Sequence, residues 1–241
     1  MSTERSAERP SLSIIIPTFN EALSIRAMLE QVAHVRGRNE IIVVDGGSTD
    51  ETVKIARNLG AQVITSERGR GLQMRSGACA AQGEALWFIH ADTMPSPDAA
   101  ERILETLEHD AEAVGGNFRI CFDGNRRAAR FLTWLYPQLR KLGLCYGDSA
   151  IFVRASTYKQ VGGFQPFPIF EDLDLVRRLR QRGRLVHLQA TVLTSSRRFE
   201  GRSFALTFTR WAILQALYWA GVHPRILGRL YTPIRNARAK N

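Results

Sequence analysis

The sequence predicts an α/β fold in which a mostly parallel, doubly wound β-sheet carries helices on both faces. The runs of β-branched residues at 12–16 and 41–45 are too short for helices and are apolar throughout, as in strands buried on both faces. Segments of helical length separate such runs, and this alternation is typical of a parallel sheet. Each run stops abruptly in polar residues, at the strand end where open α/β sheets bind ligands. The two strand ends therefore predict a nucleotide-sized pocket.

The first half of the chain alternates strands and helices in regular order. We expect strands at 12–16, 41–45, 61–65 and 85–90. We expect helices at 23–35, 50–59, 72–81 and 98–109. Asp50 and Glu51 support the second helix, because carboxylates in a first turn complement the positive end of a helix. This half supplies both strands of the predicted pocket.

The second half of the chain is less regular. We expect strands at 113–121, 149–154 and 185–193, and helices at 127–141 and 170–181. No stretch is rich enough in Gly, Ser or Pro to mark a linker. We therefore expect one domain at 12–200, between a disordered N-terminus at 1–11 and a basic, aromatic tail at 201–241.

Composition indicates an ordinary globular protein. The chain has 241 residues, of which 44% are hydrophobic and 23% charged, so it can bury a large core. Cys79, Cys121 and Cys145 are odd in number and form no CxxC pair, which predicts reduced, buried thiols in a cytoplasmic protein. The N-terminal residues 1–11 are polar and charged, so we expect no signal peptide.

The net charge of +10 is concentrated in the last part of the chain. Fourteen of the 33 basic residues but only one acidic residue, Glu200, lie from Arg177 onward, so this part carries +13 and the part before it −3. Such asymmetry predicts an anionic partner, which could be nucleic acid, an anionic membrane surface or a phosphorylated substrate. The alternative is a solvated basic surface without a partner.

The stretch 203–222 predicts a C-terminal amphipathic helical tail. It is apolar and aromatic but carries Arg210 and Gln215 near its middle. A central arginine costs about 2.5–3.5 kcal/mol on insertion scales, which disfavours a membrane span. A helix lying in the bilayer interface fits better, with Arg225 and Arg229 behind it and the protein peripheral at the inner face of the membrane. A helix that packs on the protein or on a second subunit is the alternative.

Three groups of charged residues are candidates for chemistry. Asp45 and Asp92 close two of the predicted strands, where carboxylates can bind a base, a ribose or a divalent cation. Glu171 and Asp172 open the helix at 170–181, where Asp172 is either a helix cap or a functional carboxylate. The nearby Asp174 is expected to pair with an arginine one turn later.

Two arginine-containing segments have phosphate-binding character. Arg197 and Arg198 follow two serines, and a guanidinium binds phosphate oxygens through two hydrogen bonds. Arg70 lies in a glycine-rich turn before a helix. Neither the Walker pattern nor GxGxxG is present in the expected place, which argues against P-loop NTPases and Rossmann dehydrogenases.

The chain resembles the family 2 glycosyltransferases, which have a GT-A fold. The resemblance covers residues 12–200 and rests on five motifs in the expected order. These motifs are IIPTFNE at 15–21, VVDGGSTD at 43–50, HADT at 90–93, VGGF at 161–164 and EDLD at 171–174. The HADT form is similar to that of a small bacterial subgroup.

The resemblance implies a role for each matching residue. The residues implied to line the nucleotide pocket are Pro17, Thr18, Asn20, Glu21, Asp45, Arg70, His90 and Ala91. Asp92 matches the last aspartate of the family's DxD motif, which binds Mn²⁺ or Mg²⁺ on the donor diphosphate. Asp172, with Glu171 beside it, matches the carboxylate that acts as general base in inverting members. Arg197 and Arg198 would hold the diphosphate.

One residue departs from the family pattern. His90 stands where the DxD motif has its first aspartate, and a neutral imidazole offers a hard cation one negative charge less. We expect metal binding to be retained through Asp92 but weakened.

The resulting hypothesis is a metal-dependent, inverting glycosyltransferase of the hexosyltransferase class. It would move a sugar from a UDP- or GDP-linked donor to a hydroxyl acceptor, for which a lipid-linked molecule is one candidate. One alternative is a nucleotidyltransferase of related fold, although the expected glycine-rich loop with a following lysine is absent after the first strand. The other alternative is a non-catalytic nucleotide- or nucleic-acid-binding protein. Binding of nucleic acid would leave the acidic residues at the strand ends unexplained. The sequence does not decide whether the protein forms a homo-oligomer.

Overall fold

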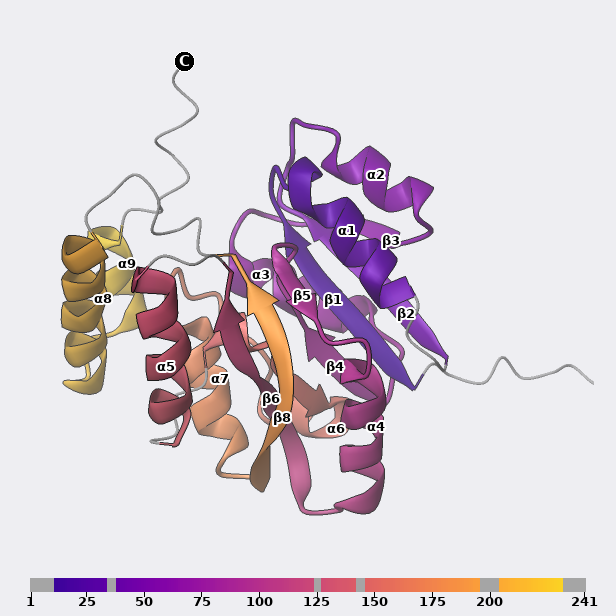
Figure 1. Cartoon of the computed structure of the whole chain (residues 1–241). Coiled ribbons are helices and arrows are strands. Elements are labelled where there is room, and N and C mark those ends of the chain that lie inside the picture. The colour runs from indigo at the N-terminus through magenta and orange to yellow at the C-terminus, as the bar shows by residue number, and fades with distance from the viewer. Residues whose placement is uncertain (1–10, 34–37, 124–126, 142–145, 196–203, 232–241) are drawn as a thin grey trace, which may run out of the picture.

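The described residues build an eight-stranded mixed sheet with helices on both faces (Figure 1). The computed structural model describes residues 11–33, 38–123, 127–141, 146–195 and 204–231. The strands are β1 (Leu12–Thr18), β2 (Asn39–Asp45), β3 (Gln62–Thr65), β4 (Ala85–Phe88), β5 (Thr93–Pro95), β6 (Ala113–Phe122), β7 (Phe152–Arg154) and β8 (Arg184–Thr194). The helices are α1 (Ala22–Ala33), α2 (Thr52–Asn58), α3 (Arg70–Ala80), α4 (Ala99–His109), α5 (Arg127–Lys141), α6 (Ala155–Gln160), α7 (Glu171–Leu179), α8 (Phe204–Trp219) and α9 (Pro224–Leu230).

The strand order places the ends of β1, β2 and β4 beside one another. The order across the sheet is β3-β2-β1-β4-β7-β6-β8-β5. Strand β1 pairs in parallel with both β2 and β4, β2 with β3, and β6 with β8. Strand β7 is antiparallel to β4 and β6, and β5 is antiparallel to β8. The predicted mostly parallel α/β sheet is confirmed, and the carboxyl ends of its parallel strands share one edge.

Two apolar layers enclose the sheet and explain why its first strand is apolar throughout. Ile14 and Ile16 pack in the layer formed with α1, α4 and α5. Ile15, which points to the opposite face of the strand, packs in the layer formed with α3, α6 and α7. All three side chains are fully buried. Since successive strand residues alternate between faces, a strand with helices on both sides needs an apolar residue at every position.

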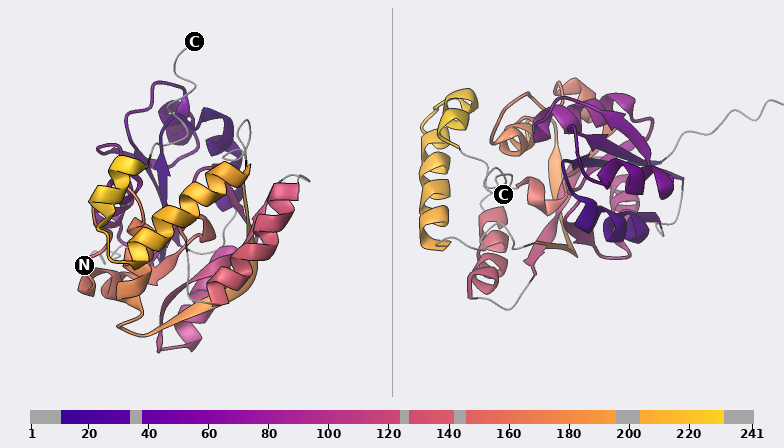
Figure 2. Two further views of the ribbon diagram at one scale, coloured as in Figure 1. Left: turned by 90° about the vertical axis from the view of Figure 1, so that its left-hand side faces the viewer. Right: turned by 90° about the horizontal axis from the view of Figure 1, so that it is seen from above.

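A third apolar cluster joins the C-terminal helices to the rest of the protein. Leu214 of α8 and Leu227 of α9 are buried against Tyr146 and the segment Ile169–Leu173. Figure 2 shows α8 and α9 as an outer layer, with α5 running beside α8. Within the described ranges, no helix is both long enough and apolar enough to cross a bilayer.

The structure departs from the predicted elements in the middle of the chain. Strand β4 ends at Phe88 rather than at residue 90, and the edge strand β5 has only three residues, one of them a proline, so it leaves no pattern in the sequence. Helix α6 was not predicted, and the predicted strand 149–154 begins as the short 3-10 helix Gly147–Ser149. The expectation of buried thiols is wrong for Cys79, which is exposed, and Cys145 lies outside the described residues.

A buried glutamine fixes the edge of the sheet where the parallel strands end. The Nε2 of Gln73, on α3, donates hydrogen bonds to the carbonyl oxygens of Thr18 (2.7 Å) and Val44 (2.8 Å). These carbonyls belong to β1 and to β2. Gln73 is 4% exposed, so the bonds are protected from water. Its amide therefore holds both strand ends against α3.

We predict that Gln73→Met destabilises the protein by about 1–3 kcal/mol, because the change removes two buried hydrogen bonds while keeping the side-chain volume similar. Urea unfolding followed by circular dichroism measures this. The matched control is Gln82→Met, at an exposed position, which should change the free energy of unfolding by no more than about 0.5 kcal/mol. Equal losses in the two variants would contradict the role assigned to Gln73.

Candidate active site

The carboxylate of Asp45 organises the loop that follows β2. Its Oδ2 accepts hydrogen bonds from the backbone N–H groups of Gly47 and Ser48, both at 2.9 Å. Its Oδ1 accepts a hydrogen bond from the Ser48 hydroxyl. These three hydrogen bonds come from the loop itself and use much of the hydrogen-bonding capacity of the Asp45 carboxylate. Asp45 is also buried, at 4% exposed. The structure thus places Asp45 at the predicted strand end as the residue that shapes the loop there.

The loop after β1 is joined to the loop after β2. Asn20 has a left-handed backbone (φ 53°), and its Oδ1 accepts a hydrogen bond from the Thr49 N–H at 2.8 Å. The Asn20 N–H donates to Ser48 Oγ at 2.9 Å, and the Glu21 N–H donates to Thr52 Oγ1 at 2.8 Å. The family motifs at 15–21 and 43–50 therefore form one connected structure.

The other residues predicted at this end differ in how far they can reach a ligand. Pro17 lies inside β1, buried and paired with Val44. Thr18 is also buried, and Glu21 is 7% exposed with its carboxylate accepting a hydrogen bond from Ser24 (2.9 Å). Asn20 is the exposed member of the group.

Arg70 connects α3 to the acidic start of α7. Its Nε lies 2.8 Å from Oε1 of Glu171, whose side chain is 2% exposed, whereas that of Arg70 is 39% exposed. The neighbouring Gly71 makes this approach feasible, since a Cβ there would lie 2.7 Å from the carbonyl oxygen of Gln165. The negative charge of Glu171 has the largest effect on Arg70 and raises the pKa of its guanidinium. The charges of Asp172 and Asp148 act in the same direction with smaller effects. The other oxygen of Glu171, Oε2, is buried and has no hydrogen-bond partner among the described residues.

Asp172 is a buried carboxylate held by two backbone hydrogen bonds. Its Oδ2 accepts from the Gly147 N–H (2.5 Å) and its Oδ1 from the Leu173 N–H (2.7 Å). Burial, and then the charge of Glu171, raise the pKa of Asp172 to about 6, although Arg70 and the two hydrogen bonds act in the opposite direction. A carboxylate with this pKa is ionised at neutral pH yet is a stronger base than an exposed one.

Gly147 brings His90 and Asp172 to the same place. A Cβ at residue 147 would lie 3.2 Å from Nε2 of His90 and 3.3 Å from Oδ2 of Asp172. The two side chains therefore converge on the backbone of Gly147, although they lie far apart in the sequence. Neither Gly147 nor Gln73 was singled out by the sequence, because a glycine or glutamine outside a known motif carries no chemical signal.

The segment 90–92 links β4 to the edge strand β5. Ala91 is buried and Asp92 is half-buried. The backbone carbonyl of Asp92 accepts a hydrogen bond from the N–H of Ser195 at 3.2 Å, so the end of β8 lies beside the predicted metal residue. Arg197 and Arg198, which follow shortly afterwards, lie outside the described residues.

A cation at Asp92 would need ligands beyond the side chains that the described residues gather there. The described part of the chain holds no group of three His, Cys, Asp or Glu side chains suited to binding a metal ion. A carboxylate oxygen is nonetheless a ligand that Mg²⁺ and Mn²⁺ accept, and Mg²⁺ sites often combine one or two carboxylates with phosphates and water. The residues present thus fit a cation that is bound together with a diphosphate.

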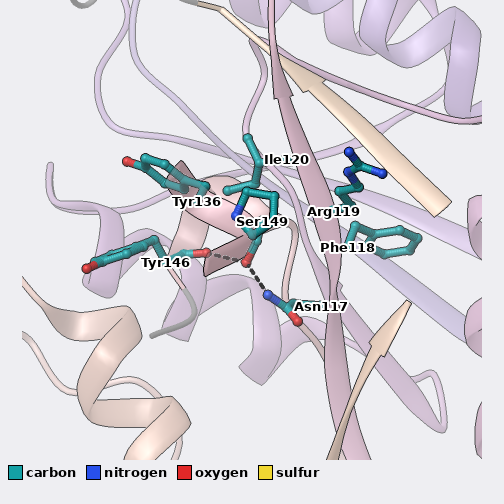
Figure 3. Close-up of a pocket in the computed structure, with 8 residues that line it drawn as sticks. Asn117, Phe118, Arg119, Ile120, Tyr136, Tyr146 and Ser149 are labelled. Carbon is teal, nitrogen blue, oxygen red and sulfur yellow. Dashed lines mark hydrogen bonds between the residues drawn. The ribbon is translucent and has the colours of Figure 1, made fainter. Parts of the chain in front are cut away.

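A small pocket lies between β6, α5 and the segment 146–149 (Figure 3). It is lined by residues of β6, α5 and the 3-10 helix, and its cavity volume is about 10 Å³, room for about one water molecule. Inside it the Asn117 amide donates to Ser149 Oγ (2.9 Å), and the Ser149 hydroxyl donates to the Tyr146 carbonyl (2.5 Å). These hydrogen bonds join β6 to the 3-10 helix that carries Gly147.

The VGGF motif is held by the charged helix α7. The guanidinium of Arg178 binds Oδ2 of Asp174 at 2.7 Å and donates to the carbonyl of Gly163 at 2.8 Å. Arg177 also contacts Asp174, at 3.3 Å. The expected pairing of Asp174 with arginines one turn later is therefore confirmed, and it positions the glycine-containing loop.

Solved structures share the fold of this chain. A mannosyltransferase from Pyrobaculum calidifontis, solved with GDP-Man and Mn²⁺, superposes with a TM-score of 0.65 at 20% identity over 88% of this chain and 63% of that one. Glucosyl-3-phosphoglycerate synthase from Mycobacterium tuberculosis, solved with Mn²⁺ and UDP-glucose, gives 0.60 at 21% identity over 90% and 81%. The predicted GT-A-like fold is confirmed.

Sequence comparison gives the family. The "Glycosyltransferase AglE" of Haloferax volcanii is 29% identical over 175 residues, which are 66% of this chain and 56% of that protein. A "PGL/p-HBAD biosynthesis glycosyltransferase" of Mycobacterium bovis is 33% identical over 166 residues, 64% of this chain and 63% of that protein. The chain thus spans between half and two thirds of the length of these relatives. The family model "Glycosyl transferase family 2" matches residues 13–160, more than half of the chain, and the chain therefore belongs to glycosyl transferase family 2.

Proposed function

We propose that the chain is an inverting glycosyltransferase that moves a hexosyl group from a UDP- or GDP-linked donor to a hydroxyl acceptor. The observation that carries the proposal is Asp172, a buried carboxylate with a pKa raised to about 6 at the ligand-binding edge of the sheet. Membership of the family supports the reaction type. The nucleotide-sugar ligands of the two solved structures support the donor class.

Asp172 is the proposed general base. Each carboxylate oxygen accepts one backbone hydrogen bond and keeps lone-pair capacity for another, so Asp172 can accept a proton without losing its anchors. It would remove the proton of the acceptor hydroxyl as that oxygen attacks the anomeric carbon in line, and the nucleoside diphosphate would leave on the opposite face. A base whose pKa lies near the working pH is effective in such a step.

The other site residues are proposed to hold the donor and to position the base. Glu171 acts as a positioning residue, because its carboxylate holds Arg70. Asn20, Glu21, Asp45, His90 and Ala91 would form the nucleotide side of the site with Pro17 and Thr18 behind them. Arg197 and Arg198 remain proposed diphosphate residues. A Mn²⁺ or Mg²⁺ ion held by Asp92 would stabilise the negative charge of the leaving diphosphate.

The acceptor that we propose is lipid-linked. A series of contacting aromatic rings leads toward Asp172 from Phe131, which is exposed. The ring centroids are 5.9 Å apart between Phe131 and Phe208, 6.1 Å between Phe208 and Trp211, and 5.2 Å between Trp211 and Tyr146. Tyr146 directly precedes Gly147, the residue that hydrogen-bonds Asp172. The exposed ring of Phe131, at the outer end of this series, suits contact with an apolar acceptor tail, whereas Tyr146 at the inner end is buried.

The donor class can be tested by thermal shift with UDP, GDP and their sugar conjugates, each with and without Mn²⁺. A ligand that binds the native state raises the melting temperature. We expect a Mn²⁺-dependent rise with one nucleotide and its conjugates. No rise with any of them would contradict the proposal, and a response to nucleoside triphosphates with release of diphosphate would favour a nucleotidyltransferase.

We predict that Asp172→Asn lowers turnover by about a hundredfold to ten thousandfold while donor binding survives, because the amide cannot accept the proton. Hydrolysis of the nucleotide sugar, with water as the acceptor, provides the assay without knowledge of the natural acceptor. NMR of the first sugar released should show the inverted anomer. The matched control Asp98→Asn, at the start of α4, should keep wild-type turnover. Loss of donor binding in Asp172→Asn would instead make Asp172 a donor-site residue.

We predict that turnover at saturating donor rises with pH around a midpoint of about 6, since Asp172 acts only after losing its proton. Because its pKa is raised in the folded state, Asp172 also lowers stability as pH rises from about 4 to about 6. Arg70→Gln removes a positive charge that favours the carboxylate, so the midpoint should move to higher pH. Arg75→Gln, an exposed arginine on the same helix, is the control and should leave the midpoint unchanged. An unmoved midpoint in Arg70→Gln would argue against Asp172 as the titrating base.

We predict that Asp92→Ala abolishes Mn²⁺ binding measured by calorimetry in the presence of the nucleoside diphosphate. We also predict that His90→Asp tightens Mn²⁺ binding, because the change supplies the charge that the HADT form of the proposed subgroup lacks. Equal binding by the wild type and Asp92→Ala would rule out the proposed metal residue.

A further inference from the structure

The large exposed hydrophobic side chains of the described residues gather on three neighbouring helices. Nine such side chains are exposed, and seven of them belong to α5, α8 and α9. On α5 and α8 these are Phe131, Trp134, Leu206, Ile213 and Trp219, and on α9 they are Ile226 and Leu230. We call this surface the α5–α8–α9 face. The surfaces of soluble proteins seldom carry so many neighbouring apolar side chains unless a partner covers them.

Contacts join the three helices that carry the α5–α8–α9 face. The ring of Phe131 on α5 lies 6.0 Å from that of Phe204 and 5.9 Å from that of Phe208, both on α8. Arg210 of α8 donates a hydrogen bond to the backbone carbonyl of Leu230 at the end of α9. Figure 2 shows the three helices on the same side of the molecule, with α8 and α9 outermost.

The helix α8 is apolar on both sides, unlike a helix that faces water. Leu214 and Gln215 are buried, and Trp211 and Tyr218 pack beside them against the body of the protein. The opposite side nevertheless presents Leu206 and Ile213, which are 72% and 55% exposed, and Trp219, on the flank between the two sides, is 62% exposed. A helix of this kind has a second apolar side that packing within the described residues leaves in water.

The positive charge near the α5–α8–α9 face favours an anionic partner. Helices α5, α8 and α9 together contain seven basic residues and neither Asp nor Glu. Arg130, Arg225 and Arg229 are exposed beside the apolar side chains. A second copy of the chain in a symmetric contact would place like charges opposite each other, which is unfavourable. Nucleic acid would pair with the arginines but leave the exposed isoleucine and leucine side chains in water.

We propose that the α5–α8–α9 face docks on the surface of an anionic lipid bilayer. The apolar side chains would enter the boundary between headgroups and acyl chains, where tryptophans such as Trp134 and Trp219 are favoured. The arginines would contact the anionic headgroups. This inference goes beyond the transfer reaction and does not depend on it.

Co-sedimentation of the full chain with vesicles tests the proposal. Vesicles of phosphatidylcholine are compared with vesicles that contain about one third phosphatidylglycerol, at low and at high salt. We expect binding to the anionic vesicles that weakens as salt rises. No binding to anionic vesicles, or equal binding to the neutral ones, would overturn the proposal.

Two pairs of substitutions locate the contact. The first pair removes apolar contact and combines Ile213→Asp with Trp219→Asp. The second pair reverses charge and combines Arg225→Glu with Arg229→Glu. We expect each pair to lower vesicle binding about tenfold or more. Leu23→Asp, at a side chain that is 93% exposed on α1, is the control for the first pair. Lys54→Glu with Arg57→Glu on α2 is the control for the second. Unchanged binding in both test pairs, or an equal loss in the controls, would overturn the proposal.

Two further measurements distinguish membrane docking from dimer formation and from damage to the donor site. Light scattering measures the oligomeric state in solution. A wild-type dimer that becomes a monomer in both pairs of substitutions would overturn the proposal, because the α5–α8–α9 face would then join two copies of the chain. The nucleotide-dependent thermal shift in the same variants reports on the donor site alone. A test variant that loses vesicle binding but keeps a normal nucleotide-dependent shift supports the docking proposal. If the wild type binds vesicles but shows no nucleotide-dependent shift, the docking proposal stands and only the proposed function is overturned.

Discussion

Two adjacent carboxylates at the start of α7 impose the central electrostatic constraint on this structure. Glu171 and Asp172 are 1% and 5% exposed, and buried charges of one sign repel each other strongly because little water screens them. Arg70 offsets this repulsion through its contact with Glu171. It comes from α3, in the first half of the chain, so the charge balance also ties α3 to the segment that carries the proposed base. The close approach of Gly71 to Gln165 is the packing consequence of this tie.

The balance of effects at Asp172 explains why this carboxylate is basic without being neutral. Burial and Glu171 push its pKa upward, whereas Arg70 and the N–H groups of Gly147 and Leu173 stabilise its charged form. The two backbone hydrogen bonds and Arg70 thus limit the rise in the pKa of Asp172 that burial and Glu171 produce. Gly147 serves this balance in a second way. Its missing side chain leaves room for His90 beside Asp172, so these two side chains can converge.

The parts of the molecule that follow from the sequence are those with a repeating pattern or a family motif. The alternation of apolar runs and helical segments predicted the strands β1 to β4, and the motifs at 15–21 and 43–50 marked two loops that the structure joins through Asn20 and Thr49. The edge strand β5 was not predicted, because a three-residue strand has no periodicity. Of the strand expected at 149–154, only the last three residues form the antiparallel strand β7. Gln73 was missed for a different reason. Its importance lies in two carbonyl oxygens far away in the sequence, and no local pattern reports such a contact.

The C-terminal helices show how a local pattern leaves two interpretations open until three-dimensional packing is known. In the sequence the aromatic residues of α8 suggested either an interfacial helix or a packed one. In the structure Trp211 and Tyr218 pack inward while Trp219 faces outward, so one helix has a surface for each role.

The inward side of α8 also reaches the proposed base. The Tyr146 hydroxyl donates to Oε1 of Gln215 at 3.4 Å, and the ring of Tyr146 contacts Trp211. Because Tyr146 directly precedes Gly147, the helix that carries the proposed docking surface supports the backbone group that holds Asp172. These contacts connect the helices of the α5–α8–α9 face to the proposed base within one packed apolar cluster.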